Sequence, residues 1–566
     1  MAENTETDVL VVGAGPTGLA AAIELRQRGL DCRVVEKESS AVESSRALGI
    51  QPRTLQIFDD MGVLERILDE GFRVTGASVY EGSTEVLRLD MDALSGTPYP
   101  FLWWLPQNRT EQILLDRLEG LGVDVEFGRE LTGFGQNRET ITAWVDDADG
   151  PSDTDNGESG GEEVAAKWLL GCDGAHSRVR RTLGREMKGT TTAQEILVAD
   201  VALDWNRPGE EAAIWLHENG VAAVLPMRGE GNWRLFLDVT PIPAPYRPDA
   251  TRAEVQRILR DRTSYPDVTV TETLWTSTYV ANQRMVEGYR HGRVFLAGDA
   301  AHVHNPLGGQ GMNLGIGDAY NLGWKLALVH EGNAPDRLLD TYDEERIPVA
   351  EAVIEETGFS GSLLITANPA VRRVRDAVIP RVVGPEPVQR RIFRSVSMLA
   401  TNYRGRSLSR VDVQSPLSGL FGNSWRDAVR RAHSDWTAPK AGDRAPDAPC
   451  RPPDGTETSL YELLHDRLGF VLLLFSGPDD DGRALAPIAD GLDRESVHPV
   501  LVTLDARDPP EFDGTTVIDG DGRFHDRYGA VRPTLYLLRP DDHVGLTVQP
   551  PRREALDAYC DEWLSV

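Results

Sequence analysis

One carboxylate and one glycine-rich turn follow a short apolar stretch in the segment RVFLAGDAAHVHNPLGGQGMN, residues 293–313. Residues 294–297 predict a strand, and Asp299 stands just past its carboxyl end, where a carboxylate can bond ribose or ribityl hydroxyl groups. The turn leads into a helix that is expected to begin near Met312, and the N-terminus of a helix attracts negative charge. The pattern predicts a site for a hydroxylated, anionic ligand. The residues expected to wrap its ring system are Pro306, Gly309, Gly311, Met312 and Asn313.

A second glycine-rich turn, GAGPTG at residues 13–18, lies far upstream, after a predicted strand and before a predicted helix. Such a turn lets a pyrophosphate approach the backbone and lets the helix pack closely on the strand. Glu36 ends the next predicted strand, and an acid there favours an adenosine ribose without a 2′-phosphate. The combination predicts dinucleotide binding; the alternative is a glycine-rich turn that holds no ligand. The residues expected at this site are Gly13, Gly15, Pro16, Thr17, Gly18 and Glu36.

A third motif is the Asp-Gly turn in GCDGAHSRVRR, residues 171–181. Taken alone, it predicts a capped helix in which Asp173 or Ser177 accepts hydrogen bonds from backbone N–H groups. His302 and His304 bring two imidazoles close together in the sequence. Because no third ligand stands at a useful spacing, no metal site is expected.

The composition argues against several classes of protein. Asp and Glu number 89 against 59 Lys and Arg, and the net charge of -30 argues against a nucleic-acid binder or an anionic membrane surface. Only five of the basic residues are lysines, which is typical of a salt-rich cytoplasm or of a high-GC genome. The polar start MAENTETD and the lack of a long apolar run predict a cytoplasmic protein without a membrane span. The four cysteines form no CxxC pair, which fits a reducing compartment.

Hydrophobic periodicity divides the 566 residues into regions with different patterns, and the length predicts two to four domains. Residues 8–36 predict a β-α-β unit, and residues 190–285 alternate in a way that predicts a largely antiparallel sheet. The acidic stretch 146–163 predicts a mobile hairpin tip or surface loop. Helices are expected at 54–68, at 110–120, and from 312 to about 405.

Together the three motifs resemble those of the class A flavoprotein monooxygenases, the aromatic hydroxylases typified by p-hydroxybenzoate hydroxylase. The family's GxGxxG sequence is found at residues 13–18, its DG motif at 173–174 and its GD motif at 298–299. The block GDAAHxxxPxGGQGMN, followed by DAxNLGWKLA at residues 318–327, is very specific. The similarity covers nearly the whole chain. It is closest to the branch of phenol and polyketide hydroxylases that carries a C-terminal thioredoxin-like domain.

The resemblance implies an α/β fold with a Rossmann-like FAD domain, an inserted antiparallel-sheet substrate domain, a helical segment and a thioredoxin-like α/β domain. The expected boundaries are 1–75, 101–185 and 286–365 for the discontinuous FAD-binding domain, 76–100 and 186–285 for the substrate-binding β-sheet domain, 366–440 for the helical segment and linker, and 441–566 for the thioredoxin-like domain. Because the last domain has no CxxC, disulfide exchange is not expected. Its Pro533 precedes an apolar strand, as the cis-proline of thioredoxins does.

The resemblance also carries cofactor contacts over, one residue at a time. The segment SSRALGIQPRTLQIF implies Arg46 beside the flavin and pyrophosphate, and LPQNRTEQILLDRL implies that Gln107 contacts FAD. Lys37 is expected at the adenosine end, and a backbone contact near Leu131 is implied as well. For Arg46 the alternative is a surface salt bridge, and for Gln107 it is a cap at the start of a helix. The implied set also includes Asp173 and Asp299.

The resemblance further implies a monooxygenase that uses FAD, NADH or NADPH as reductant, and O2. It implies hydroxylation of a phenolic or polyketide-like ring through a flavin C4a-hydroperoxide. A Baeyer–Villiger outcome stays open, as do two other classes: a flavin-bearing protein that sequesters a ligand without oxidising it, and a flavin reductase or dehydrogenase without oxygen transfer. The expected partner is a small aromatic substrate, with no nucleic acid or membrane, and a homodimer stays open. Pocket candidates, each with a core position as the alternative, are Trp103, Trp215, His217 and Tyr279.

Overall fold

The computed structural model describes residues 5–41, 47–90, 94, 96–149, 161–207, 209–240, 251–304, 309–364, 381–383, 385–413, 438–465, 467–477, 482–493, 496–504 and 511–565. The chain splits into two compact units. The first contains Met1–Ser95, Tyr99–Tyr320 and Ile347–Leu399, and the second contains Gly96–Pro98, Asn321–Arg346 and Ala400–Val566. This grouping departs from the domain boundaries expected from the sequence. The reason is that Trp324 and Leu338 share one apolar core with the C-terminal strands.

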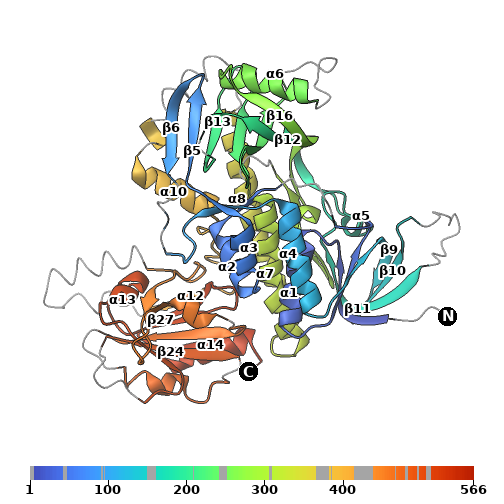
Figure 1. Ribbon diagram of the computed structural model, residues 1–566. Helices are drawn as coiled ribbons and strands as arrows, with labels where there is room; N and C mark the ends of the chain where they lie inside the picture. The colour runs from blue at the N-terminus through green and yellow to red at the C-terminus, as the bar shows by residue number, and fades with distance from the viewer. Residues whose placement is uncertain are drawn as a thin grey trace. The chain divides into compact units, whose positions relative to one another are not determined.

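The first unit contains a sheet with a parallel centre, in the order β17-β18-β11-β1-β2-β8, with β10 and β9 continuing from β11. Figure 1 labels β9, β10 and β11 of this sheet. Its strands are β1 (Thr5–Val12), β2 (Cys32–Glu36), β8 (Val125–Phe127), β9 (Arg129–Gln136), β10 (Ile141–Asp147), β11 (Glu162–Gly171), β17 (Arg290–His291) and β18 (Val294–Leu296). β1 pairs in parallel with β2 and β11, and β11 pairs in parallel with β18. With α1 (Pro16–Gln27) between β1 and β2, the predicted β-α-β unit is confirmed. The carboxyl ends of β1, β11 and β18 meet at one edge, where the three motifs begin.

A second sheet of the same unit has the order β19-β16-β12-β15-β14-β13-β5-β6. Its strands are β5 (Gly76–Glu81), β6 (Thr84–Asp90), β12 (Lys188–Asp204), β13 (Glu211–Trp215), β14 (Ala222–Pro226), β15 (Asn232–Asp238), β16 (Thr269–Met285) and β19 (His302–Val303). The pairings are antiparallel except that of β13 with β5, so the predicted antiparallel sheet is confirmed. Helix α6 (Arg252–Thr263) packs on one face, against a core that contains Ala199 and Leu235 (Figure 1). Alternation along the strands therefore places their neighbours Asp200 and Arg234 on the other face.

A small sheet of β3 (Gly49–Ile50), β7 (Leu102–Trp104) and β4 (Phe72–Val74) lies in the same unit, with β7 in the middle. The helix predicted at 110–120 is confirmed by α4 (Gln107–Gly120). The helical stretch predicted around 54–68 is confirmed, although it is divided in two. The structure has two helices there, α2 (Pro52–Asp60) and α3 (Leu64–Glu70). Gly62 between them has φ +69°, a left-handed conformation that ends a helix.

The long helix predicted after the GD motif is confirmed by α7 (Gly311–His330), and α8 (Thr341–Leu364) and α10 (Glu386–Val396) follow it. Parts of two predicted regions lie outside the described residues: 150–160 of the acidic loop, and 366–380, 384 and 414–437 of the helical segment and linker. Across the part of the chain that is described, no helix combines the length and the apolar character needed to cross a membrane.

The second unit contains a sheet in the order β20-β27-β26-β23-β24-β25. Its strands are β20 (Arg410–Val413), β23 (Phe470–Phe475), β24 (Val497–Thr503), β25 (Thr515–Ile518), β26 (Thr534–Leu538) and β27 (Val544–Gln549), with a separate pair β21 (Pro449–Cys450) and β22 (Thr458–Ser459) and the helices α12 (Leu460–Leu464), α13 (Arg523–Tyr528) and α14 (Arg553–Trp563). β23 is buried along its whole length, as its apolar sequence predicts. Pro533 directly precedes the buried strand β26, as its sequence position predicts. In the described part of the chain the cis peptide bond is Gln549–Pro550.

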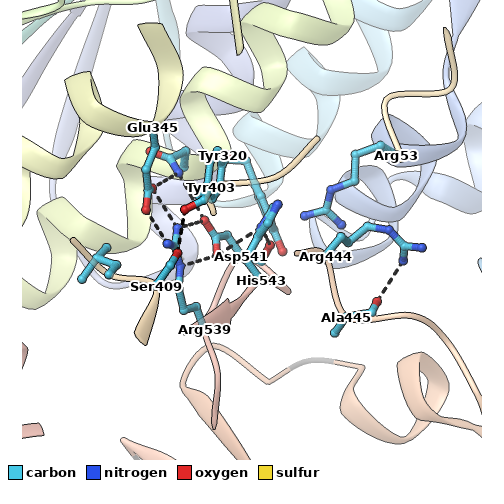
Figure 2. Close-up of polar contacts among 12 residues, drawn as sticks. Arg53, Tyr320, Glu345, Tyr403, Ser409, Arg444, Ala445, Arg539, Asp541 and His543 are labelled. Carbon is cyan, nitrogen blue, oxygen red and sulfur yellow. Dashed lines mark hydrogen bonds and ion pairs between the residues drawn. The ribbon is translucent and has the colours of Figure 1, made fainter. Parts of the chain in front are cut away.

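The same unit contains a buried ion network, which we define as Lys325, Glu345, Arg539 and Asp541. Figure 2 labels Glu345, Arg539 and Asp541 of this network. Lys325 donates to Glu345 at 2.7 Å, and the guanidinium of Arg539 pairs with both carboxylates. All four side chains are at most 2% exposed. The guanidinium also lies 5.1 Å from the ring centroid of Tyr403. A long-range set of paired charges thus fixes the core of the second unit.

Candidate functional site

The first glycine-rich turn packs against the end of β11. A Cβ atom on Gly13, whose φ is +103°, would lie 2.5 Å from the carbonyl oxygen of Cys172, and one on Gly18 would lie 1.9 Å from the carbonyl oxygen of Gly13. Only glycine fits these two places. A Cβ atom on Gly15 would instead meet nothing within 4 Å, and Gly15 precedes α1 without a side-chain cap. The turn thus presents an uncapped helix N-terminus, with Pro16 in its first turn, and such an end suits an anion.

Glu36 lies beside the same turn. Its Oε2 accepts a hydrogen bond from the backbone N–H of Ala14 at 2.7 Å, and its Oε1 accepts one from the N–H of Glu38 at 3.0 Å. The neighbouring Lys37 is mostly exposed, and its ammonium lies 3.7 Å from the carboxylate of Glu38. The carboxylate of Glu36 therefore stands at the turn, at the end of β2 where the sequence predicts ribose recognition.

Asp173 caps a helix and also contacts the first turn. Its Oδ2 accepts hydrogen bonds from the backbone N–H groups of Arg178 at 2.6 Å and Val179 at 3.1 Å, at the start of α5 (Arg178–Thr182). The capped helix predicted from the sequence is confirmed. Its Oδ1 is buried and accepts no hydrogen bond within the described residues. Because a Cβ atom on Gly13 would lie 2.9 Å from the Cα atom of Asp173, the DG and GxGxxG turns pack directly on each other.

Thr17 joins the first turn to the GD motif. A Cβ atom on Gly298, whose φ is +58°, would lie 2.5 Å from Thr17 Oγ1, and one on Gly315 of α7 would lie 2.2 Å from the same atom. The helices that follow the two glycine-rich turns therefore meet at one side chain. Asp299 lies next to this contact on the short 3-10 helix Gly298–Ala300. Its side chain is exposed and makes no hydrogen bond or ion pair with any described residue.

His302 and Asp318 hold the GD motif in place. Nε2 of His302 lies 2.7 Å from Oδ2 of Asp318, and the same oxygen accepts the N–H of Gly298 at 3.1 Å. Both side chains are buried, so His302 serves a structural pair. Sequence reasoning misses Asp318 as its partner. The only signal is that Asp318 opens the DAxNLGWKLA block, and nothing local indicates what it contacts.

Asn313 fixes the first turn of α7 against β3. Its Oδ1 accepts the N–H of Gln51 at 2.9 Å, and its Nδ2 donates to the carbonyl oxygens of Gly49 and Gly309, both at 2.9 Å. The side chain of Asn313 is buried, so these three bonds satisfy most of its amide group. These bonds attach the N-terminal end of α7 to β3, the strand that follows Arg46.

The other residues that the sequence predicts as cofactor contacts lie in several parts of the structure or outside the described residues. Gly311 and Met312 form the first two residues of α7. Leu131 is buried on β9 and pairs with Val145 in the antiparallel ladder with β10. Pro306 and Arg46 lie outside the described residues.

Gln107 and Arg234 both hold the backbone of Ala47. Oε1 of Gln107 accepts the N–H of Ala47, and the backbone N–H of Gln107 donates to the carbonyl of Ala47, both at 3.1 Å. Arg234 Nη1 donates to the same carbonyl at 3.0 Å, while its Nε and Nη2 pair with Asp200 at 2.6 and 2.7 Å. The second sheet thus contacts the residue that follows Arg46. Sequence reasoning misses Arg234, because its partner Asp200 lies opposite it on another strand.

Glu111 is a buried carboxylate near the same segment. Nε2 of Gln107 donates to it at 2.8 Å, and its side chain is 4% exposed. Burial raises the pKa of Glu111 to about 7, the hydrogen bond from Gln107 opposes this rise, and the negative charge of Glu36 adds to it. The group is therefore protonated below neutral pH and pays a desolvation cost above it.

The structure does not bring the four predicted pocket residues together. Trp215 is completely buried in the core beneath α6, as its core alternative predicts. His217 lies in the turn after β13, where its Nδ1 accepts a backbone hydrogen bond. Tyr279 pairs with Ile196 across β16 and β12, and therefore lies on the face that carries Asp200.

Trp103 and its neighbour Trp104 differ in their contacts, as alternation along β7 requires. The indole N–H of Trp103 donates to the carbonyl of Ile67 at 2.9 Å, which ties Trp103 to α3. Trp104 instead packs edge-on against Phe72, with ring centroids 6.2 Å apart, in a separate apolar cluster. We interpret Trp103 as a structural anchor.

Comparisons with known proteins agree with this arrangement. Residues 6–357 match a family described as FAD binding domain. A flavin-dependent monooxygenase of Mycobacteroides abscessus is 33% identical over 563 residues, covering 96% of this chain and 98% of that protein. A 12-dehydrotetracycline 5-monooxygenase/anhydrotetracycline 6-monooxygenase of Streptomyces rimosus is 33% identical over 562 residues, covering 96% and 95%. The structure of aklavinone-11 hydroxylase in a ternary complex with FAD and aklavinone aligns with a TM-score of 0.76 and 25% identity, covering 99% of each chain.

Proposed function

The chain belongs to the class A flavin-dependent monooxygenases, the aromatic hydroxylases, and from this premise we propose that it hydroxylates a phenolic or polyketide-like ring with NADH or NADPH and O2. The names of two similar proteins support the substrate class, since one is a monooxygenase of anhydrotetracycline and the other a hydroxylase of aklavinone. We place the reaction in the cytoplasm, with a small aromatic molecule as the substrate.

The residues around Thr17 fit an FAD molecule. A glycine turn that admits no Cβ atom at Gly13 and an uncapped helix N-terminus at Gly15 suit a pyrophosphate. We assign the adenosine ribose to Glu36 and the ribityl chain to Asp299, because both carboxylates stand at strand ends beside the two turns. When bound, FAD supplies the redox and oxygen-transfer chemistry, which side chains cannot provide.

The contribution of the chain itself is to bind, orient and exclude water. Asn313 and the His302–Asp318 pair fix the leading end of α7 and the GD motif. The N-terminus of α7 stabilises negative charge near the ring system. The sheet face with Asp200 and Arg234 contacts the backbone that follows Arg46, and we assign the substrate side of the site to this face.

One observation carries the proposal: Asp299 is an exposed carboxylate without a partner among the described residues, next to the contact of Thr17 with Gly298 and Gly315. The test is oxygen uptake by the purified flavoprotein with NADH or NADPH, with and without a panel of phenols and hydroxylated polycyclic rings. Ring-stimulated uptake with one labelled oxygen atom from isotope-labelled O2 in the product is the expected result. Reductant oxidation without incorporation for any ring would indicate a reductase, and a bound flavin that NAD(P)H never reduces would indicate a sequestering protein.

A further inference from the structure

We propose that Trp104 is a specificity-determining residue whose indole N–H donates a hydrogen bond to an oxygen atom of the aromatic substrate. The inference rests on the proposed function and deepens it. It narrows the substrate to a flat ring system that carries a phenolic or carbonyl oxygen on the side facing β7.

The first observation is the contrast between two adjacent tryptophans on β7. Trp103 has a satisfied indole N–H, 2.9 Å from the carbonyl of Ile67. Trp104 is 8% exposed, and its indole N–H donates to none of the described residues. The nitrogens of Trp215 and Trp324 are buried without a partner among the described residues, but Nε1 of Trp104 is not among such atoms. The N–H group of an otherwise buried ring is therefore accessible, and a ligand oxygen can accept a hydrogen bond from it.

The second observation is the position of that N–H group. A Cβ atom on Gly49 would lie 3.6 Å from Nε1 of Trp104 and 4.0 Å from the carbonyl oxygen of Gly309. The carbonyls of Gly49 and Gly309 both accept from Nδ2 of Asn313. The indole N–H therefore lies beside the leading end of α7, where the ring system of the cofactor is proposed to lie.

The third observation is the apolar wall around the indole ring. Trp104 belongs to a cluster that includes Ala77 and Ala212 of the second sheet and Phe393 of α10, and the less buried Leu225 packs against it. Both alanines are buried in this cluster. An apolar wall with a single directional donor suits a flat aromatic ligand with one oxygen to orient.

The test compares Trp104→Phe with Trp103→Phe, each of which keeps an aromatic ring and removes one N–H group. The flavin absorbance change reports binding of naphthols and hydroxyanthraquinones, without turnover. For Trp104→Phe we expect the dissociation constant of the tightest-binding ring to rise about tenfold, with FAD content and melting temperature close to wild type. For Trp103→Phe we expect a lower melting temperature and an unchanged dissociation constant, because its N–H bonds the protein.

Naphthalene, which has no oxygen, provides the ligand-side control and should bind wild type and Trp104→Phe equally. A merely structural role for Trp104 would weaken naphthalene and naphthol alike, which would overturn the inference. An unchanged dissociation constant in Trp104→Phe, or a wild-type protein that binds no ring of the panel, would overturn it as well. Failure of the proposed function is separate: the wild type would then bind rings in this assay and incorporate no labelled oxygen into any of them.

Discussion

The carboxylate of the GD motif and those of the ion network in the second unit differ in solvent exposure and in hydrogen bonding. Asp299 is exposed and has no partner among the described residues. Glu345 and Asp541 are buried, and each accepts hydrogen bonds from Arg539 and Asn321 (Figure 2). An unpaired charge that is buried has a large desolvation free energy, so it must be paired within the protein. An exposed carboxylate is hydrated and needs no partner in the protein before a ligand binds. From this difference we infer a ligand-binding role for the exposed Asp299 and a stabilising role for the buried Glu345 and Asp541.

The largest effect on stability is expected from Glu345→Gln, which removes one negative charge from the ion network. The substitution leaves the cations of Lys325 and Arg539 with less compensating charge in a buried place. The free energy of unfolding should fall by about 3–5 kcal/mol, measured by urea denaturation of the holoprotein. Glu355→Gln, an exposed position on the same helix α8, is the matched control and should stay within about 0.5 kcal/mol of wild type.

The same variant also makes a pH prediction. Burial opposes ionisation of Glu345, but the charges of Arg539 and Lys325 outweigh it and lower its pKa from 4.5 to about 2. A carboxyl with a depressed folded pKa stabilises the protein above its unfolded pKa and loses that contribution as the pH falls toward the folded one. Wild type should therefore lose stability between pH 4.5 and about 2 more steeply than Glu345→Gln. Equal slopes would show that the network does not hold this carboxylate ionised.

The comparison also shows what the sequence could predict. The GxGxxG turn, the following helix and the strand before Asp299 follow from local patterns of apolar residues and glycines. Asp299, Asp318 and Lys325 all lie between residues 298 and 327, yet of these three side chains only that of Asp299 is exposed to solvent. Asp318 bonds His302, and Lys325 bonds Glu345, 20 residues further on in the chain. Long-range pairing of this kind depends on the packed fold, so no local pattern separates ligand-facing charges from structural ones.

Gly62 and β7 illustrate the same limit at shorter range. The sequence predicts a helical stretch around 54–68, and the left-handed φ of Gly62 divides it into α2 and α3. On β7 the two neighbouring tryptophans have different partners, since Trp103 donates to the carbonyl of Ile67 and Trp104 packs against Phe72. The sequence shows that successive side chains of a strand alternate between two faces, but it does not show which element packs on each face.

Glu111 is intermediate between Asp299 and the ion network. It is buried and accepts a hydrogen bond from Gln107, but it forms no ion pair with the described residues. Burial raises its pKa from 4.5 to about 7. A carboxyl with a raised folded pKa destabilises the protein increasingly as the pH rises from the unfolded value to the folded one. Glu111→Gln should therefore be more stable than wild type at pH 8, by up to about 3 kcal/mol, and equal to it near pH 4.5. Thermal denaturation at both pH values measures the difference.

Glu119→Gln is the matched control for that prediction, because Glu119 lies exposed on the same helix α4. It should show no pH-dependent gain. If Glu111→Gln were less stable than wild type at pH 8, the carboxylate would have a cationic partner and would stabilise the protein as Glu345 does.

The smallest effect on stability and a clear effect on binding are expected from Asp299→Ala. Because the side chain is exposed and bonds no described residue, the unfolding free energy of the apoprotein should change by no more than about 0.5 kcal/mol. Loss of a hydrogen-bonding carboxylate should raise the dissociation constant of FAD about tenfold or more, measured by fluorescence titration. Asp124→Ala, at another exposed aspartate, should change neither quantity. If Asp299→Ala instead destabilised the apoprotein while binding FAD normally, the open carboxylate would be structural, and openness to solvent would no longer distinguish a binding group from a stabilising one in this fold.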